Sequence, residues 1–206
     1  MTTTPKITLY ELGPTRSARV RWMLLEAGLP FDSIGNSVEV FKSSELRGIH
    51  PLGKLPAVLI DSKPLFESAA IVTAIADLVP EKNLIAKAGT WSRNLHNQWV
   101  AYALSEMEPF VQSTELNSSD FLLPHDKHIA AIIPQNEAIF RRAAKALDGA
   151  LAGNDYLVDN RFSATDVIIG YTVSWGQELR WLSDCANLQT YLARLLTREH
   201  CTLPKH

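Results

Sequence analysis

The sequence predicts an α/β N-terminal domain with a mixed four-stranded sheet, followed by an all-α C-terminal helical bundle. In the first eighty residues, short apolar runs alternate with single amphipathic helical patterns, whereas the remainder shows only helical periodicity. The periodicity changes near residues 78–89. We therefore expect an α/β domain over residues 1–79, a linker over residues 80–89 and a helical domain over residues 90–206.

The composition limits the classes of protein to which the chain can belong. Of its 206 residues, 46% are apolar and 20% are charged, which suffices for a large core. The net charge of -2 provides no positive field for nucleic acid or an anionic membrane. Two cysteines, Cys185 and Cys201, lack the spacing of a zinc site, and no apolar run has the length of a signal peptide or a membrane span. We expect a soluble cytoplasmic protein that binds no nucleic acid, no membrane and no metal.

The order of elements in the first part predicts the topology of the sheet. Residues 7–11 have the pattern of a strand, and the turn after them opens a helical pattern that Gly28 closes. Residues 31–40 are extended, and residues 43–48 can form a short helix. Two further strands and a last helix follow; their expected ranges are 57–60, 63–66 and 68–78. A βαβ crossover followed by an antiparallel hairpin gives a mixed sheet with helices on its faces.

Four long helical patterns make up the second part. Their expected ranges are 90–117, 126–151, 163–179 and 188–198. Pro109 and Pro134 interrupt the first two patterns and should kink or break them, because proline removes a backbone donor and clashes with the preceding turn. Five tryptophans lie on helical patterns and are expected to be core or interface anchors: Trp22, Trp91, Trp99, Trp175 and Trp181.

Leu55-Pro56 is the first candidate for a functional role, since it lies between a polar loop and the apolar strand over residues 57–60. A cis bond there would turn the backbone of Leu55 outward, where it could pair with an extended peptide. An ordinary trans turn is the commoner outcome, because only about 5–6% of X-Pro bonds are cis. The residues themselves leave both alternatives open.

Two helix starts provide further candidates. Ser68 begins the helix over residues 68–78, so it could donate to a ligand carboxylate while Glu67 pairs with an ammonium. Thr15 or Ser17, in the turn before the first helix, could donate a hydrogen bond to a thiolate. In each case a simple N-cap role explains the residues as well.

Four collinear motifs resemble the cytosolic glutathione transferase superfamily over nearly the whole chain. They are YELGPTRSARVRWMLLEAGLPF at residues 10–31, PLGKLPAV at residues 51–58, LFESAAI at residues 65–71 and FSATDV at residues 162–167. The first is similar to the opening strand and helix of bacterial and zeta-like members, and the last to a buried helix start with a Ser163–Asp166 capping box. The resemblance implies a thioredoxin-like N-terminal domain that binds glutathione and a helical domain that supplies the electrophile pocket.

The resemblance also implies roles in binding glutathione. Leu55, held outward by a cis Pro56, would bond the cysteinyl backbone of glutathione. Glu67 and Ser68 would take the γ-glutamyl end. Lys42 and Lys54 stand where members often place polar or basic residues near the glycyl carboxylate.

The thiol-activating position departs from the family pattern. Pro14 occupies the position that is usually serine in zeta-like members, and proline cannot donate a hydrogen bond. Thr15 is therefore the first choice for stabilising the thiolate and Ser17 the second, with Arg16 as an electrostatic helper. Tyr10 fits the tyrosine-type arrangement less well. His50 stands where asparagine is common, and we assign it no role.

The expected function is that of a glutathione transferase acting on a small hydrophobic electrophile. Glu106, Met107 and Phe110 could line the electrophile pocket, although packing explains them equally well. The alternative is a catalytically weak protein of the same fold, kept for binding ligands or other proteins. The family also implies a homodimer, with an isologous interface between the first domain of one subunit and the second domain of the other.

Overall fold

A computed structural model describes residues 4–13 and 15–204 of the chain. Four strands form one sheet in the order β2-β1-β3-β4. They are β1 (Ile7–Glu11), β2 (Asp32–Gly35), β3 (Ala57–Ile60) and β4 (Lys63–Phe66). β2 pairs with β1 in parallel, and β3 is antiparallel to both β1 and β4. The mixed four-stranded sheet is confirmed.

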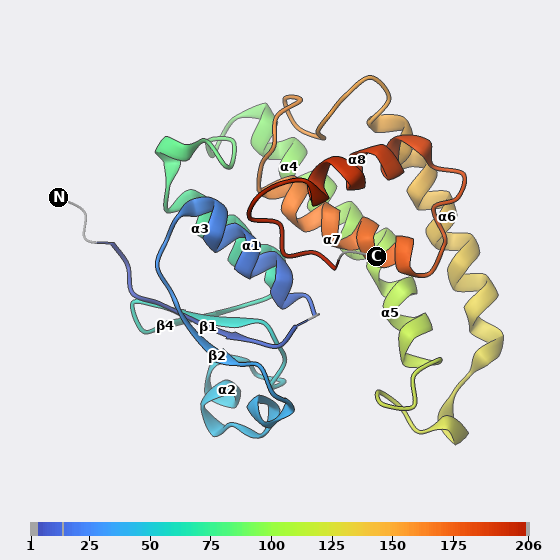
Figure 1. Cartoon of the computed structure of the whole chain (residues 1–206), viewed down its shortest axis with the longest axis horizontal. Coiled ribbons are helices and arrows are strands. Elements are labelled where there is room, and N and C mark those ends of the chain that lie inside the picture. The colour runs from blue at the N-terminus through green and yellow to red at the C-terminus, as the bar shows by residue number, and fades with distance from the viewer. Residues whose placement is uncertain (1–3, 14, 205–206) are drawn as a thin grey trace.

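Three helices cover the two faces of the sheet. They are α1 (Ser17–Ala27), α2 (Ser44–Ile49) and α3 (Ser68–Asp77). α1 and α3 pack side by side on one face, and α2 lies on the other (Figure 1). Gly28 ends α1 in the left-handed conformation, with φ 64°, as the sequence predicts.

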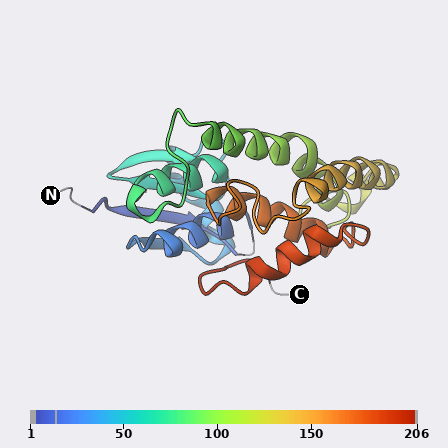
Figure 2. The ribbon, with the colours of Figure 1, turned by 90° about the horizontal axis from the view of Figure 1, so that it is seen from above.

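Five α-helices in the described residues form the C-terminal half. They are α4 (Trp91–Tyr102), α5 (Glu108–Leu116), α6 (Ile133–Ala150), α7 (Ala164–Glu178) and α8 (Ala186–Leu196). α7 is the central helix, since it contacts α4 and α8 of its own half and both α1 and α3 of the other half (Figures 1 and 2). The helical C-terminal domain is therefore also confirmed.

The two prolines act in different ways. The helix expected over residues 90–117 is divided by a π-helical turn, Ala103–Met107, and Pro109 lies in the first turn of α5, which confirms a local break. The helix expected from residue 126 begins only at Ile133, after two short 3₁₀ turns, so the expected start is wrong, and at Pro134 the pattern is broken instead of kinked. Pro134 lies in the first turn of α6, where the missing N–H would have had no helical partner.

One hydrophobic core joins both halves. Val20 of α1, Ile71 of α3 and Ile168 of α7 belong to the same buried cluster. On α7, a Cβ added at Gly176 would lie 2.3 Å from the Phe140 ring, so glycine permits this close helix packing. The halves therefore stabilise each other through packed side chains.

The tryptophans are less uniform than the sequence suggests. Trp22, Trp175 and Trp181 are buried and Trp99 packs partly against the core. Trp91 is 75% exposed, so it is not a core anchor, because it begins α4 on the side that faces solvent. None of the helices in the described part of the chain has the length and apolarity that a membrane crossing requires.

Candidate functional site

The sequence-predicted binding segments meet at one end of the sheet. Tyr10 pairs with Ala57, which in turn pairs with Phe66. The turn after β1, the residues before β3 and the residues after β4 therefore lie at the same end of the sheet, which is called the sheet edge below. α1 and α3 both begin there, which directs the positive ends of two helix dipoles toward this edge.

The hydroxyls of Thr15 and Ser17 form a small network in the turn before α1. Thr15 Oγ1 donates to the Leu12 carbonyl and lies 2.9 Å from Ser17 Oγ, which accepts from the Leu12 N–H at 3.2 Å. Ser17 is only 1% exposed, whereas Thr15 is half-buried. Of the two candidates, Thr15 is the more exposed residue. Pro14 lies outside the described residues.

Ser68 is tied to α1 by a buried arginine. Arg19 Nη1 donates to Ser68 Oγ at 3.2 Å, and Arg19 is completely buried. Because Arg19 occupies a lone pair of the Ser68 oxygen, the hydroxyl hydrogen of Ser68 stays available to donate to another acceptor. The guanidinium also adds positive charge beneath the start of α3.

The same guanidinium belongs to a buried charge cluster between the two halves. Arg19 forms an ion pair with Glu108 of α5, and Arg16 Nε lies 2.8 Å from the other oxygen of that carboxylate. Burial alone would raise the pKa of Glu108, but the two guanidiniums outweigh it and lower that pKa to about 2. Two cations therefore share the Glu108 carboxylate, and a second carboxylate, that of Glu115, also interacts electrostatically with Arg16.

The remaining glutathione-binding candidates lie at the sheet edge or on the surface. The Leu55-Pro56 bond is cis, with Leu55 half-buried and Pro56 buried directly before β3. Glu67 is exposed and has φ 67° at the N-cap of α3. Lys54 is exposed beside Leu55, and Lys42 is exposed and paired with Glu39 at 3.1 Å.

The three expected electrophile residues differ in their exposure. Met107 has no exposed surface and belongs to the shared core, so no substrate reaches it in this conformation. Glu106 is exposed in the π-helical turn, and Phe110 is half-buried in α5. The side chains that contact Arg16 are instead Glu108, Gln112 and Trp175.

Two residues that the sequence left aside have structural partners elsewhere. The Tyr10 hydroxyl faces α2 and donates to Glu45 at 3.4 Å, and burial and Glu45 raise the pKa of Tyr10. His50 is buried, and its Nδ1 accepts the Leu52 N–H at 3.0 Å. Both side chains therefore stabilise the α2 side of the sheet.

Arg19 and Glu108 are the site residues that sequence reasoning missed. Arg19 had a detectable signal, because it lies four residues before Met23 and so on the apolar face of α1. A buried arginine needs a buried partner. The sequence does not identify that partner, since Glu108 lies 89 residues away.

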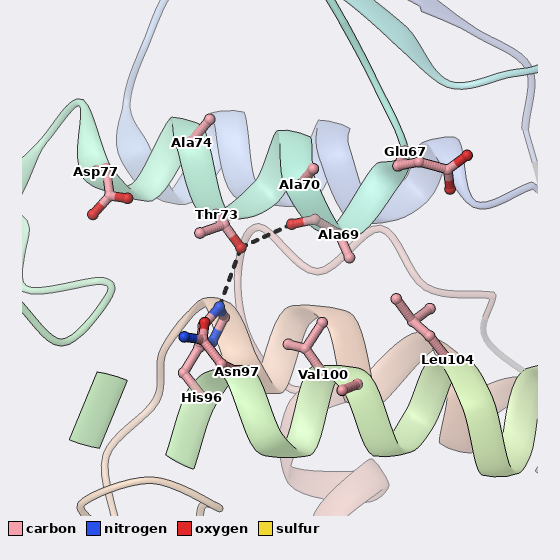
Figure 3. A pocket seen from close by; sticks show the side chains of 11 residues that line it. Glu67, Ala69, Ala70, Thr73, Ala74, Asp77, His96, Asn97, Val100 and Leu104 are labelled. Carbon is pink, nitrogen blue, oxygen red and sulfur yellow. Dashed lines mark hydrogen bonds between the residues drawn. The ribbon is translucent and has the colours of Figure 1, made fainter. Parts of the chain in front are cut away.

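A separate hollow of about 600 Å³ lies between α3 and α4 (Figure 3). Small side chains of α3 face Val100 of α4 and Leu104 of the following π-helical turn across it. At one end the His96 ring bridges Thr73 at 3.1 Å and Thr165 at 2.9 Å. Burial and the nearby Arg93 lower the pKa of His96 to about 4, so this ring is neutral at pH 7.

Part of the chain matches the model of a known family. Residues 5–77 match the family model described as "Glutathione S-transferase, N-terminal domain". This range contains the three sheet-edge segments described above. The match includes the segments that carry Thr15, Leu55 and Ser68.

Relatives extend the similarity beyond this domain. Human glutathione S-transferase A4 is 30% identical over 170 residues, which cover 80% of this chain and 70% of the relative. Glutathione S-transferase GST-4.5 of Xanthomonas campestris pv. campestris is 25% identical over 178 residues, which cover 86% of this chain and 84% of the relative. A theta class glutathione S-transferase of Xanthomonas axonopodis pv. citri, solved with glutathione bound, has a TM-score of 0.80 at 23% identity over 95% of both chains. That structural likeness establishes the fold.

Proposed function

Because the chain belongs to the glutathione S-transferase family, we propose that it is a transferase that presents the glutathione thiolate to a small hydrophobic electrophile. The observation that carries this proposal is the convergence of the Thr15 turn, Leu55 and Ser68 at one end of the sheet. The proposed location is the cytoplasm, where glutathione keeps thiols reduced.

Glutathione is a dianionic carboxylate ligand with an ammonium group, and the sheet edge has complementary groups. Ser68 would donate its free hydroxyl hydrogen to the γ-glutamyl carboxylate at the start of α3, and Glu67 would pair with the ammonium. The backbone of Leu55 would pair with the cysteinyl backbone. Lys54 would approach the glycyl carboxylate, with Lys42 as a more distant contributor.

Thr15 would stabilise the thiolate by changing its acceptor. Without ligand, its single hydroxyl hydrogen is donated to the Leu12 carbonyl, while Ser17 fixes the Thr15 oxygen from the side. Turning that hydrogen to a thiolate exchanges a neutral bond for a charge-assisted one, a gain of about 1 kcal/mol. That gain lowers a thiol pKa by about one unit, and the nearby Arg16 guanidinium would add to it.

The electrophile would approach from the side of the helical domain. Gln112 and Trp175 contact the Arg16 side chain and so form the helical surface nearest to the Thr15 turn. We propose these two residues as the first electrophile contacts, ahead of Glu106, Met107 and Phe110. In a substitution, the sulfur–carbon bond forms and the leaving group departs with its bonding electrons.

The test compares Thr15→Ala, Thr15→Ser and the unmodified protein with glutathione and a chlorodinitrobenzene. We expect Thr15→Ala to lower kcat/KM by about 10–100-fold. It should also raise the pKa of the bound glutathione thiol by roughly one to two units, which thiolate absorbance measures. Thr15→Ser keeps the hydroxyl and should keep most of the activity. Equal rates and equal thiol pKa values in all three proteins would overturn the role of Thr15.

Calorimetry with reduced glutathione distinguishes the broader alternatives. Binding with turnover above the uncatalysed rate supports the transferase, whereas binding without turnover identifies a ligand-binding protein of the same fold. No heat of binding would exclude both. Ser68→Ala should weaken glutathione binding by about tenfold. Lys54→Ala should weaken it more than the matched surface change Lys42→Ala.

We also propose that the hollow between α3 and α4 receives a second copy of the chain. Its walls come from both domains, as an isologous contact between first and second domains requires. Ala70, Ala101 and Leu104 are exposed apolar residues on these walls. Sedimentation should therefore give twice the 22.9 kDa of one chain, and Leu104→Glu should give single chains. A monomeric unmodified protein would contradict this assignment.

A further inference from the structure

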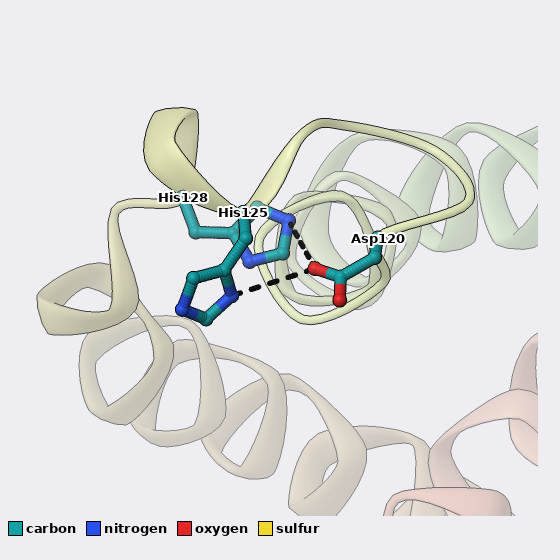
Figure 4. A group of neighbouring side chains, drawn as sticks. All are labelled: Asp120, His125 and His128. Carbon is teal, nitrogen blue, oxygen red and sulfur yellow. Dashed lines mark ion pairs between the residues drawn. The ribbon is translucent and has the colours of Figure 1, made fainter.

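The loop between α5 and α6 brings together three side chains that can ligate a metal ion. Their ligand atoms, from Asp120, His125 and His128, all lie within 4.8 Å of one another (Figure 4). Asp120 Oδ1 is 3.4 Å from His125 Nδ1 and 3.8 Å from His128 Nε2. In Figure 4 both imidazole rings point toward the same carboxylate oxygen.

These separations are close to those of a zinc coordination shell. Zinc bonds nitrogen at about 2.0–2.1 Å and carboxylate oxygen at about 2.0–2.2 Å, so neighbouring ligands of a tetrahedral site lie roughly 3.3–3.5 Å apart. The Asp120–His125 separation already falls in that range. The Asp120–His128 separation exceeds it by a few tenths of an ångström, which rotation of the exposed Asp120 side chain can remove.

The loop is held in place independently of any ion. The Ile129 N–H donates to Asn117 Oδ1 at 2.8 Å, and Asn117 Nδ2 donates to the Ser113 carbonyl of α5 at 2.8 Å. The His128 side chain is only 8% exposed, and its Nε2 lies 2.8 Å from the Leu123 carbonyl oxygen. Without an ion, His128 Nε2 therefore carries its hydrogen and donates it to that carbonyl.

We propose that Asp120, His125 and His128 bind a divalent cation of the zinc class, which fastens the loop between α5 and α6. Two imidazoles and one carboxylate favour zinc or a similar transition metal over magnesium or calcium, which prefer oxygen ligands. The ion would replace the hydrogen on His128 Nε2. It would connect Asp120, before Pro124, with the two histidines that stand on either side of Lys127. This site lies on a different segment from the glutathione-binding residues.

Calorimetry with zinc chloride on tag-free, chelator-stripped protein tests the proposal. We expect about one equivalent of zinc per chain, and at least about tenfold weaker binding in Asp120→Asn and in His125→Ala. Both positions are exposed, so the fold should survive, which circular dichroism checks. The matched control His200→Ala removes a histidine outside the loop and should bind like the unmodified protein. Magnesium chloride should give no binding.

Trypsin provides a second measurement on the same loop. Lys127 is exposed between the two histidines, so zinc should slow cleavage after Lys127 in the unmodified protein and have no such effect in Asp120→Asn. Cleavage after the exposed Lys87 serves as the internal control, since it should proceed at the same rate with or without zinc. Zinc binding that is absent, or equally strong in Asp120→Asn and His125→Ala, would overturn the site. Unchanged cleavage after Lys127 would overturn the fastening of the loop.

Discussion

The N-termini of α1 and α7 both carry hydroxyl side chains, but their hydrogen bonds are used differently. At α7, the buried Asp166 accepts from the Ser163 N–H at 2.9 Å and from the Tyr191 hydroxyl at 2.9 Å. This helix start thus contains its own carboxylate. The first turn of α1 has no acidic residue, and its hydroxyl at Thr15 is partly accessible. A helix start that contains its own anion supports the fold, whereas one that lacks an anion can receive the anion of a ligand.

The largest effect that tests this comparison should come from Glu108→Gln. The change leaves Arg19 buried without a counter-charge, so we expect a loss of about 3–5 kcal/mol in the free energy of unfolding at pH 7, measured with urea. The folded-state pKa of Glu108, about 2, lies below its ordinary value of 4.5, so its stabilising contribution is complete above pH 4.5 and is lost as the pH falls toward 2. The stability difference between the two proteins should therefore narrow between pH 5 and pH 3. A constant difference over that interval would argue against the ion pair as its cause.

Asp166→Ala should have the next largest effect. It removes the acceptor of the Ser163 N–H and the Tyr191 hydroxyl inside the core, so we expect a loss of about 3 kcal/mol. Ser163→Ala removes only a cap and should cost about 1 kcal/mol. Thermal unfolding measures both, and the turnover of the folded protein should remain unchanged. A specific loss of turnover in either variant would show that α7 takes part in the chemistry.

Ser17→Ala should affect stability about as little as Ser163→Ala, and it sharpens the comparison within α1. The Leu12 N–H loses its side-chain acceptor, which should lower the free energy of unfolding by about 1 kcal/mol. Thr15 also loses the neighbour that positions its hydroxyl. We expect kcat/KM to fall by roughly three- to tenfold, less than in Thr15→Ala. A larger loss of turnover than in Thr15→Ala would make Ser17 the group that meets the sulfur.

Local sequence patterns account for the parts of the fold that were predicted. The hairpin of β3 and β4, the end of α1 at Gly28 and the capping box at Ser163 and Asp166 all depend on residues within a few positions of one another. Pro134 was not predictable in this way. The pattern around it fits a kinked helix or a new helix start, and only packing of the preceding loop decides between them.

The candidate site was predicted in its segments but not in its connections. Thr15, Leu55 and Ser68 were identified through a family resemblance, and the register of the sheet brings their segments to one edge. The bond from Arg19 to Ser68 and its ion pair with Glu108 join residues 49 and 89 positions apart. Pairings at such separations depend on how the helices pack, which no short motif encodes.

The central position of α7 has a consequence for synthesis of the chain. The apolar sides of α1 and α3 are covered by a helix that begins only at residue 164, more than eighty residues after α3 ends. At about 5–20 residues per second, a ribosome needs roughly 4–17 s to make that intervening segment. During this interval the nascent sheet domain displays an uncovered apolar face, which makes it a candidate client for a ribosome-associated chaperone.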